Sequence, residues 1–274
     1  MDFFDTIIIG AGQAGTPLSQ ALTQSGERVA LIEEQFVGGT CINVGCTPTK
    51  TMVASAEVAY LANRALDFGV VVSDVAVDMK KVKARKAEIV KSFRDGSRNR
   101  IINSGVELIF GTASFTGHKT LKVVTEEGET REVTAEKVII DAGGRPGNPD
   151  IEGLANVPYL NSTSIMELES VPEHLIIVGG GYIAIEFGQM FRRFGSEVTV
   201  IQHSDQLLTR EDRDIADEIR AILEEDGIKV FLNTDTTAVE KNNQTGVTLY
   251  ANSPEGEITL HGSHLLVAVG RVPN

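Results

Sequence analysis

The chain has 274 residues, 42% of them hydrophobic and 23% charged, which is the balance of a soluble globular protein long enough for two domains. Its formal net charge of -13 offers no positive field to phosphate groups, which argues against nucleic-acid binding. The N-terminus has no basic, apolar leader, and no apolar run reaches the ~20 residues of a membrane-spanning helix. We therefore expect a cytoplasmic protein without a membrane partner.

The start of the chain predicts a strand, a glycine-rich turn, a helix and a second strand. An apolar run at residues 5–9 leads into the spacing G-x-G-x-x-G, and the second strand, residues 28–32, precedes an acid. This context is typical of a dinucleotide site. The glycines allow a tight turn, close approach of the backbone to a pyrophosphate and close helix packing, while the acid accepts from a ribose hydroxyl. The residues concerned are Gly10, Gly12, Gly15 and Glu33.

The next segment, GGTCINVGCTPTK, spans residues 38–50 and holds both cysteines of the chain, Cys41 and Cys46. In an ideal helix their Cα atoms would lie roughly 8.7 Å apart. That separation exceeds the ~7 Å that a disulfide can bridge. Gly45 tolerates unusual backbone angles and Pro48 disfavours a helical residue before it, so we expect a bend that lets the thiols meet. A pair that can hold two thiols or a disulfide suits a two-electron carrier.

Three other interpretations of the cysteine pair stay open. A zinc site would need four ligands, but the chain has no second cysteine pair and its five histidines are scattered. The cysteines could instead be inert core residues. They could also form a structural disulfide, which is unusual in a reducing compartment. We favour redox function and expect no metal site.

The middle of the chain predicts one long helix followed by short strands. Residues 77–103 have the spacing and charge of a solvated helix. The glycine- and proline-rich stretch DAGGRPGNPDIEG, residues 141–153, indicates a crossover into a second domain. Between them, short strands are expected at residues 106–110, 120–125, 131–135 and 137–141.

The strand, glycine turn, helix and strand return at residues 175–202, which predicts a second dinucleotide site with Gly179, Gly181 and Ala184 at the motif positions. The second strand of this unit ends at Gln202 and His203 instead of an acid. Because an acid there favours a free 2′-hydroxyl, its absence slightly favours NADPH over NADH. Further elements are expected as a helix at residues 211–225, a strand at 228–232 and mostly strands up to LLVAVG at 265–270.

These motifs resemble those of the FAD-dependent pyridine nucleotide-disulfide oxidoreductases, which include dihydrolipoamide dehydrogenase, glutathione reductase and mercuric reductase. GGTCINVGCTPTK resembles the family pattern GGTCxNxGCxPSK, DAGGRP resembles ATGGRP, and AVGRVPN resembles ATGRxPN. The resemblance covers essentially the whole chain and is strongest to mercuric-reductase-like members. It implies an α/β fold with two Rossmann-like domains and a small antiparallel β segment. Residues 1–150 would form the FAD-binding domain with the cysteine pair, and residues 151–274 the NAD(P)-binding domain.

The resemblance also implies roles for single residues. Cys46 would lie against the flavin as the charge-transfer thiolate, and Cys41 would be the outer thiol that exchanges with substrate. Lys50 would sit beside flavin N5 and pair with Glu186, and Tyr182 would be a lid over the flavin. The alternatives are that Lys50 and Glu186 are unrelated surface charges and that Tyr182 is an aromatic side chain packed in an interface. The cofactor-binding positions implied are Gly10, Gly12, Gly15, Glu33, Gly39, Thr40, Lys50, Ala113, Gly143, Gly179, Gly181, Tyr182, Glu186, Gln202, His203, Gly270 and Arg271.

The function implied by the resemblance is that of a flavoprotein oxidoreductase. NAD(P)H would reduce FAD, FAD would reduce a disulfide between Cys41 and Cys46, and the dithiol would reduce a disulfide or metal-ion substrate. Two alternatives stay open. One is an enzyme of the same fold with idle cysteines that passes electrons to a quinone or oxygen. The other is a catalytically incomplete nucleotide-binding fragment.

Two departures from the family pattern bear on this interpretation. Asp141 replaces the usual small or apolar residue before AGGR, a change that is either harmless or weakens FAD binding. The chain stops at GRVPN, where family members continue into an interface domain that supplies the homodimer contact and a His-Glu acid-base pair. We therefore expect a C-terminally truncated chain, an incomplete enzyme and no assured dimer.

Overall fold

The structure is a computed structural model that describes residues 1–242 and 246–274. The chain divides into two compact units, Met1–Pro48 with Ala87–Arg145 and Pro273–Asn274, and Thr49–Lys86 with Pro146–Val272. The change of unit after residue 145 falls close to the predicted domain boundary at residue 150. Residues 49–86, which the sequence places in the first domain, group with the second unit, because their side chains bond to its residues.

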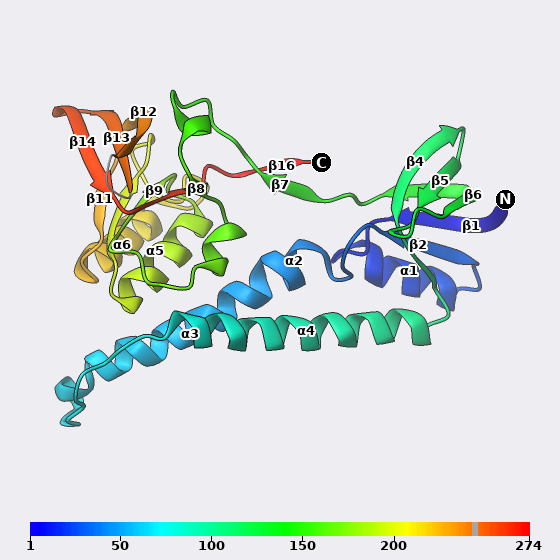
Figure 1. The fold of residues 1–274 in the computed structure, drawn as a ribbon, viewed down its shortest axis with the longest axis horizontal. Coiled ribbons are helices and arrows are strands. Elements are labelled where there is room, and N and C mark those ends of the chain that lie inside the picture. Colours follow the sequence, from blue (N-terminus) through cyan, green and yellow to red (C-terminus); the bar gives the residue numbers. More distant parts are fainter. Residues whose placement is uncertain (243–245) are drawn as a thin grey trace. The chain divides into compact units, whose positions relative to one another are not determined.

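The first unit is built around a six-stranded sheet with helix α1 against its first two strands (Figure 1). Its elements are β1 (Asp2–Ile9), α1 (Gly15–Gln24), β2 (Val29–Glu33), α2 (Gly39–Val44), β3 (Glu107–Phe110), β4 (Thr112–Gly117), β5 (Thr120–Val124) and β6 (Thr130–Ile140). The strand order is β3-β2-β1-β6-β5-β4, parallel from β3 to β6 and antiparallel from β6 to β4. The predicted Rossmann-like pattern is thereby confirmed for this unit.

The core of the first unit lies on both faces of the parallel strands. Successive residues of β1 alternate between two clusters: Ile7 packs with one and Ile8 with the other, and both are fully buried. This double burial explains why β1 and β2 read as nearly continuous apolar runs in the sequence. The glycine turn after β1 is therefore held at the carboxyl edge of a rigid sheet.

Two strand predictions for this unit need correction. The strands expected at 131–135 and 137–141 are one strand, β6, because its residues pair with β1 from Val133 to Ile140 in a single register. Strand β4 was not predicted, because its residues are mostly exposed and lack the alternation of apolar and polar positions.

The second unit repeats the parallel design with a five-stranded sheet. Its elements are η1 (Ala65–Phe68), η2 (Leu154–Asn156), β8 (Tyr159–Leu160), η3 (Ser164–Glu167), β9 (His174–Val178), α5 (Tyr182–Phe194), β10 (Glu197–Ile201), α6 (Arg213–Glu225), β11 (Lys229–Phe231), β12 (Asp235–Asn242), β13 (Gly246–Ser253), β14 (Gly256–Gly262) and β15 (His264–Val267). The parallel order is β11-β10-β9-β15-β8, and β12-β13-β14 form a separate antiparallel sheet. The predicted α/β fold with a small antiparallel segment is confirmed; residues 243–245 of the expected strand region lie outside the described residues.

Opposite faces of this parallel sheet are covered by different elements (Figure 1). Ile176 packs in a cluster with Leu249 of the antiparallel sheet, whereas its neighbour Ile177 meets α5 at Gly188. Helix α5 turns a strongly apolar face inward, with Phe187, Met190 and Phe191 buried, as its sequence period predicts. The sheet thus fixes the start of α5, which is the second glycine turn.

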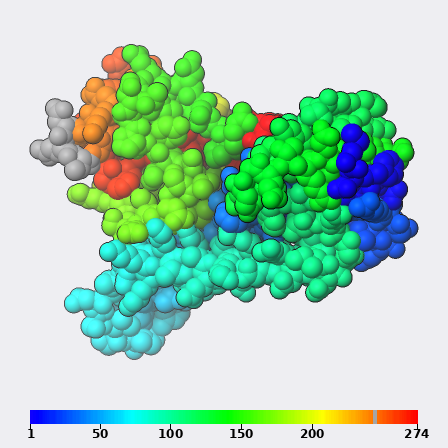
Figure 2. All heavy atoms as spheres, turned by 45° about the vertical axis from the view of Figure 1, so that its right-hand side comes forward, coloured from blue at the N-terminus to red at the C-terminus, as the bar shows by residue number. Residues whose placement is uncertain are grey.

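Four further elements are shared between the units: α3 (Cys46–Asn63), α4 (Met79–Asn103), and the strand pair β7 (Gly144–Pro146) with β16 (Arg271–Pro273). The long helix expected at 77–103 is confirmed as α4. After α3, apolar side chains such as Leu66, Phe68 and Val71 are exposed, and Figure 2 shows this segment, in cyan, at the surface. Among the described residues, no helix is both long and apolar enough to span a membrane.

Candidate functional site

The first glycine turn is shaped by backbone contacts that exclude a side chain. Gly10 donates from its amide to Ile32 O at 2.8 Å, and a Cβ added to it would lie 2.1 Å from Asp141 O. A Cβ on Gly15 would lie 2.0 Å from Gly10 O. Gly12 is different, since its nearest neighbour would be the Asp141 carboxylate at 3.6 Å. The turn is tight where strand meets helix and open at the middle glycine, where a ligand needs access.

Glu33 stands at the end of β2, where a ribose-binding acid is expected. Its carboxylate accepts from the amides of Ala11 and Gln35, each at 2.9 Å. A carboxylate has about four acceptor positions, so these two bonds leave room for a ribose hydroxyl. The amides fix the orientation of Glu33 beside the glycine turn.

Asp141 follows β6 and reaches into the same turn. One of its carboxylate oxygens accepts from the Gly15 amide at 2.8 Å, at the first residue of α1. The substitution is therefore not an idle surface change: a negative charge sits at the positive end of the helix that would bind a pyrophosphate.

The second glycine turn repeats these contacts nearly bond for bond. The Gly179 amide donates to Ile201 O at 2.8 Å, and a Cβ on Gly179 would lie 2.5 Å from Ala268 O. A Cβ on Gly181 would meet no atom of the described residues within 4 Å. The space above this middle glycine is thus free, as a bound pyrophosphate requires.

Gly180 is a residue that the motif spacing did not single out. A Cβ on it would lie 2.7 Å from Leu207 and 3.0 Å from Gln202. Only glycine therefore lets the segment after β10 pack over the turn. Gln202 is itself buried and donates to Gln206 O at 3.3 Å, whereas His203 is exposed.

The two cysteines lie on either side of a helix break. Cys41 belongs to α2 and Cys46 begins α3, with Gly45 between the helices at φ -134° and ψ -116°. A Cβ on Gly45 would lie 2.8 Å from Thr40 O and 3.3 Å from Cys41 Cα. The expected bend is confirmed at Gly45. The effect expected of Pro48 is wrong, because it lies in the first turn of α3, where proline is tolerated and the residue before it is helical.

Both cysteines are free thiols, Cys41 half-buried and Cys46 exposed. Burial, together with a hydrogen bond between the two side chains, raises the pKa of the Cys41 thiol above its ordinary value. The neutral thiol is favoured there because a thiolate would lose solvation.

Asn43, between the cysteines, fixes the position of α2. Its amide donates to Val37 O at 3.0 Å and Gly39 O at 2.9 Å, and its oxygen accepts from Arg94 Nε at 2.9 Å. Sequence reasoning missed Asn43 and Arg94, although Asn43 occupies a fixed position of the quoted cysteine pattern.

Lys50 and Glu186 form the expected ion pair, but both residues lie in the second unit, whereas the sequence placed Lys50 in the first domain. The Lys50 side chain is 64% exposed and that of Glu186 37%, so the pair contributes at most about 1 kcal/mol to stability. Tyr182, the first residue of α5, donates its hydroxyl to Glu211. That bond raises the pKa of Tyr182.

The other predicted positions lie in three places. Ala113 lies on β4, next to Thr112, whose hydroxyl donates to Glu34 at 3.0 Å beyond the end of β2. Gly39 approaches the first turn so closely that a Cβ would lie 2.7 Å from Gly12 Cα, and Thr40 follows it in α2. Gly143, Gly270 and Arg271 belong to the β7 and β16 region, where Gly147 donates to Gly270 O at 2.9 Å and Asn274 to Gly143 O at 3.1 Å.

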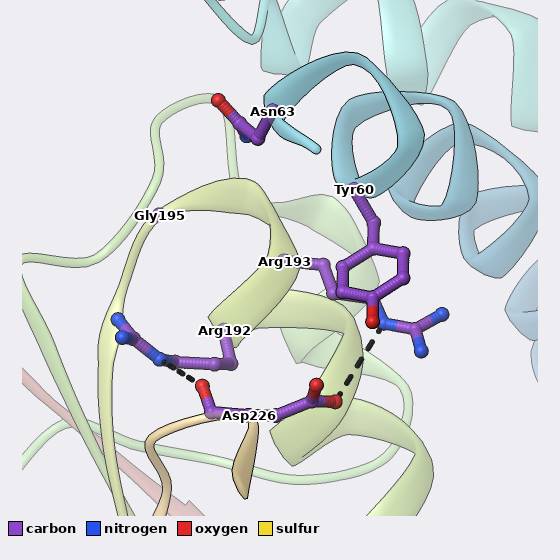
Figure 3. Close-up of a pocket in the computed structure, with 6 residues that line it drawn as sticks. All are labelled: Tyr60, Asn63, Arg192, Arg193, Gly195 and Asp226. Atoms are coloured by element: carbon purple, nitrogen blue, oxygen red, sulfur yellow. Dashed lines mark hydrogen bonds and ion pairs between the residues drawn. The ribbon is translucent and has the colours of Figure 1, made fainter. Parts of the chain in front are cut away.

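A recess of about 260 Å³ in the second unit lies away from the glycine turn. Figure 3 shows the Tyr60 ring beside the Arg193 guanidinium, which lies 4.2 Å from the ring centroid. Arg193 pairs with Glu57, and Arg192 donates to Asp226 O at 2.7 Å. Because these cations already have acidic or carbonyl partners, the recess adds no free charge for a ligand.

The sequence model of the family described as pyridine nucleotide-disulphide oxidoreductase matches residues 4–274. The chain belongs to this family. A mercuric reductase of Streptomyces lividans is 36% identical over 270 residues, 98% of this chain and 56% of the relative. A dihydrolipoyl dehydrogenase of Bacillus subtilis (strain 168) is 35% identical over 97% of this chain and 58% of its own length.

Solved structures of this family share the fold. The Cu(II) complex of the HOCl-induced flavoprotein disulfide reductase RclA from Escherichia coli matches with a TM-score of 0.85 at 35% identity. The match covers 100% of this chain and 58% of that chain. The chain thus spans little more than half the length of these family members.

The two glycine turns fit the cofactors of the family. Each has a closed first glycine and an accessible middle glycine, Gly12 or Gly181, at the start of a helix. Glu33 adds a ribose acceptor at the first turn, and no acid does so directly after β10. The residues present therefore fit FAD at the first turn and a nicotinamide dinucleotide at the second.

Proposed function

We propose that the chain is an FAD- and NAD(P)H-dependent oxidoreductase whose cysteine pair delivers two electrons to a disulfide or metal-ion substrate. The observation that carries the proposal is the hydrogen-bonded pair of free thiols, Cys41 and Cys46, brought together across the Gly45 break. Two thiols this close can be oxidised to a disulfide and reduced again without moving the rest of the fold.

The cofactors would be held by the two glycine turns. The first would bind FAD through Gly12 and the amides that begin α1, with Glu33 on a ribose hydroxyl. The second would bind NAD(P)H through Gly181 and the start of α5. Bound FAD would supply the two-electron chemistry that links nicotinamide oxidation to thiol reduction.

For a disulfide substrate, the thiol steps balance as follows. The Cys41 thiol gives up its proton and attacks one substrate sulfur, which forms a mixed disulfide, and the other substrate sulfur takes up that proton and leaves as a thiol. The Cys46 thiol then gives up its proton and attacks the Cys41 sulfur, which forms the intramolecular disulfide, and the second substrate sulfur takes up the proton and leaves as a thiol. Two electrons leave the cysteine pair, and NAD(P)H is their source when the disulfide is reduced again.

The surroundings of β10 support NADPH as the preferred nucleotide. Gln202 is buried beneath Gly180, so the exposed His203 is the first side chain able to meet a 2′ substituent. The next acid, Asp205, is neutralised by Arg213 at 2.6 Å. A 2′-phosphate would therefore face no unpaired carboxylate directly after the strand.

The visible spectrum of the purified chain tests the proposal. We expect bound flavin absorbing in the blue, bleaching with NADPH under anaerobic conditions, and a long-wavelength thiolate–flavin band that Cys46→Ser removes. Cys41→Ser should abolish disulfide reduction. A wild-type protein that oxidises NADPH with a quinone but reduces no disulfide would instead favour idle cysteines. A colourless protein that takes up no added FAD would contradict the proposal and favour a nucleotide-binding fragment.

A further inference from the structure

In both units the chain after the second strand returns over the glycine turn. In the first unit, the Gly38 amide donates to Ala11 O at 2.7 Å, and the chain continues into the cysteine helix α2. In the second, the Leu208 amide donates to Gly180 O at 2.9 Å. We call residues 203–211 the clasp segment. The matched bonds show that the clasp segment occupies the place that the cysteine segment occupies in the first unit.

The clasp segment is held firmly on the turn. Leu207 and Leu208 are buried, and Leu208 adopts a left-handed backbone with φ 48°. Leu207 fits only because Gly180 has no side chain. Such a conformation costs a leucine free energy, and it persists because the surrounding contacts fix it.

The end of the clasp segment is fixed as well. The Glu211 amide donates to Leu208 O at 2.8 Å, and the Gln206 side chain donates to Glu211 O at 3.1 Å. Glu211 immediately precedes Asp212, the N-cap residue of α6. Its backbone is therefore anchored on both sides.

Tyr182 is the side chain that Glu211 holds. It follows Gly181 directly, so its ring stands beside the open position of the turn. Tyr182 is 58% exposed, and its hydroxyl donates to the Glu211 carboxylate. Because packing restrains the ring so little, this hydrogen bond decides where it rests.

We propose that Glu211 is a positioning residue that latches Tyr182 onto the clasp segment and so keeps the space above Gly181 clear for a nicotinamide dinucleotide. The inference rests on the proposed function, which places that ligand at this turn. Without the latch, the ring would rotate freely and spend part of its time over the turn. The apparent affinity would then fall in proportion to the fraction of molecules that stay open.

Calorimetric titration of the purified chain with NADPH, and separately with NADH, tests the latch. Glu211→Ala and Tyr182→Phe both break the bond, and each should weaken binding about threefold to tenfold, the range expected for one solvent-exposed hydrogen bond. The double variant Tyr182→Ala with Glu211→Ala has no ring to obstruct the turn and should bind more tightly than Glu211→Ala alone. Glu240→Ala is the matched control, because Glu240 accepts from Tyr250 at 2.6 Å on the β12–β13 pair and should leave binding unchanged.

The outcomes separate the latch from the proposed function. A wild-type chain that binds neither nucleotide would overturn both. If the wild type binds a nucleotide and Glu211→Ala and Tyr182→Phe bind it equally well or more tightly, the latch alone would be overturned. A double variant as weak as Glu211→Ala would show that Glu211 acts through the clasp backbone and would also overturn it. Equal melting temperatures of the variants would assign the changes to the site instead of to unfolding.

Discussion

The carboxylate of Asp141 accepts a 2.8 Å hydrogen bond from the amide of Gly15, so an acid from the end of β6 caps the helix that begins the first glycine turn. Its oxygen would lie 3.6 Å from a Cβ on Gly12, the position left open for a pyrophosphate. Two negative groups would therefore share one positive helix end, and they would repel each other.

We expect Asp141→Asn to bind FAD several-fold more tightly than the wild type, because the amide oxygen keeps the cap while the charge is lost. Fluorescence titration of the flavin-free chain with FAD would measure the affinity. Asp5→Asn is the control, since Asp5 likewise accepts from a backbone amide, that of Arg28, at 2.7 Å. Equal or weaker affinity in Asp141→Asn would contradict the repulsion.

Gly45 sets the approach of the two thiols, and a side chain there should disturb it. In Gly45→Ala the new methyl would lie 2.8 Å from Thr40 O, so α2 must shift and carry Cys41 with it. We expect disulfide formation with an oxidant such as diamide to slow about tenfold, the effect of an unfavourable shift of roughly 1.4 kcal/mol.

The control for that variant is Gly96→Ala. Gly96 lies within α4, and in the part of the chain that the structure describes a Cβ there would meet no atom within 4 Å. This change should stabilise the helix by about 0.5–1 kcal/mol and leave thiol oxidation unaltered. Mass spectrometry of the disulfide over time gives the rates, and equal rates in both variants would show that Gly45 does not control the pair.

The raised pKa of Cys41 predicts that its alkylation begins at a higher pH than that of an ordinary thiol. We expect iodoacetamide to modify Cys41 with a midpoint at a higher pH than an exposed thiol, whose pKa is about 8.5. Cys46→Ser should lower the pKa only in part, because burial is the larger cause and persists in that variant. A Cys41 midpoint at or below that of an exposed thiol would show the reasoning to be wrong.

The same shift has a consequence for stability. The folded chain binds the Cys41 proton more tightly than the unfolded chain does, so the contribution of this thiol is fully present below the ordinary thiol pKa. It is lost as the pH rises through the higher, folded-state pKa. Urea unfolding of the reduced chain should therefore show stability falling in the alkaline range, and less steeply in Cys41→Ser.

Lys86 is a buried cation that ties α4 to η3 within the second unit. Its side chain is 7% exposed, and Nζ donates to Met166 O at 2.9 Å and to a Glu167 carboxylate oxygen at 2.5 Å. Lys86→Ala should lower the free energy of unfolding by about 1–3 kcal/mol, since it removes the buried hydrogen bond to the Met166 carbonyl. Lys86→Met, which keeps the aliphatic stem, should lose less.

Lys83 provides the comparison for Lys86. It contacts Glu167 O at 3.3 Å and Glu169 at 3.0 Å, but its side chain is 30% exposed. Lys83→Ala should cost under about 1 kcal/mol. Urea unfolding of both variants measures the difference, and equal losses would mean that burial of Lys86 is not decisive.

The spacing of the glycines was enough to predict the two turns, because close backbone contacts, such as that of Gly10 with Asp141 O, leave no room for a side chain. The pairing of Lys50 with Glu186 followed from the family resemblance. Gly180, Glu211 and Arg94 were beyond the sequence, since their roles depend on side chains brought near by the fold. Pro48 misled because a proline that disfavours a helix elsewhere is accommodated in the first helical turn.

His203 gives the sharpest test of the nucleotide preference. His203→Glu places a carboxylate at the first exposed position after β10, where it would accept from a 2′-hydroxyl and repel a 2′-phosphate. We expect the ratio of NADPH to NADH affinity to fall at least about tenfold, measured by calorimetry. Thr209→Glu adds the same charge to the exposed part of the clasp segment and should change the ratio far less. A ratio that moves equally in both variants would reflect the net charge of the segment and not a contact at His203, and the assignment of this residue to the 2′ position would fall.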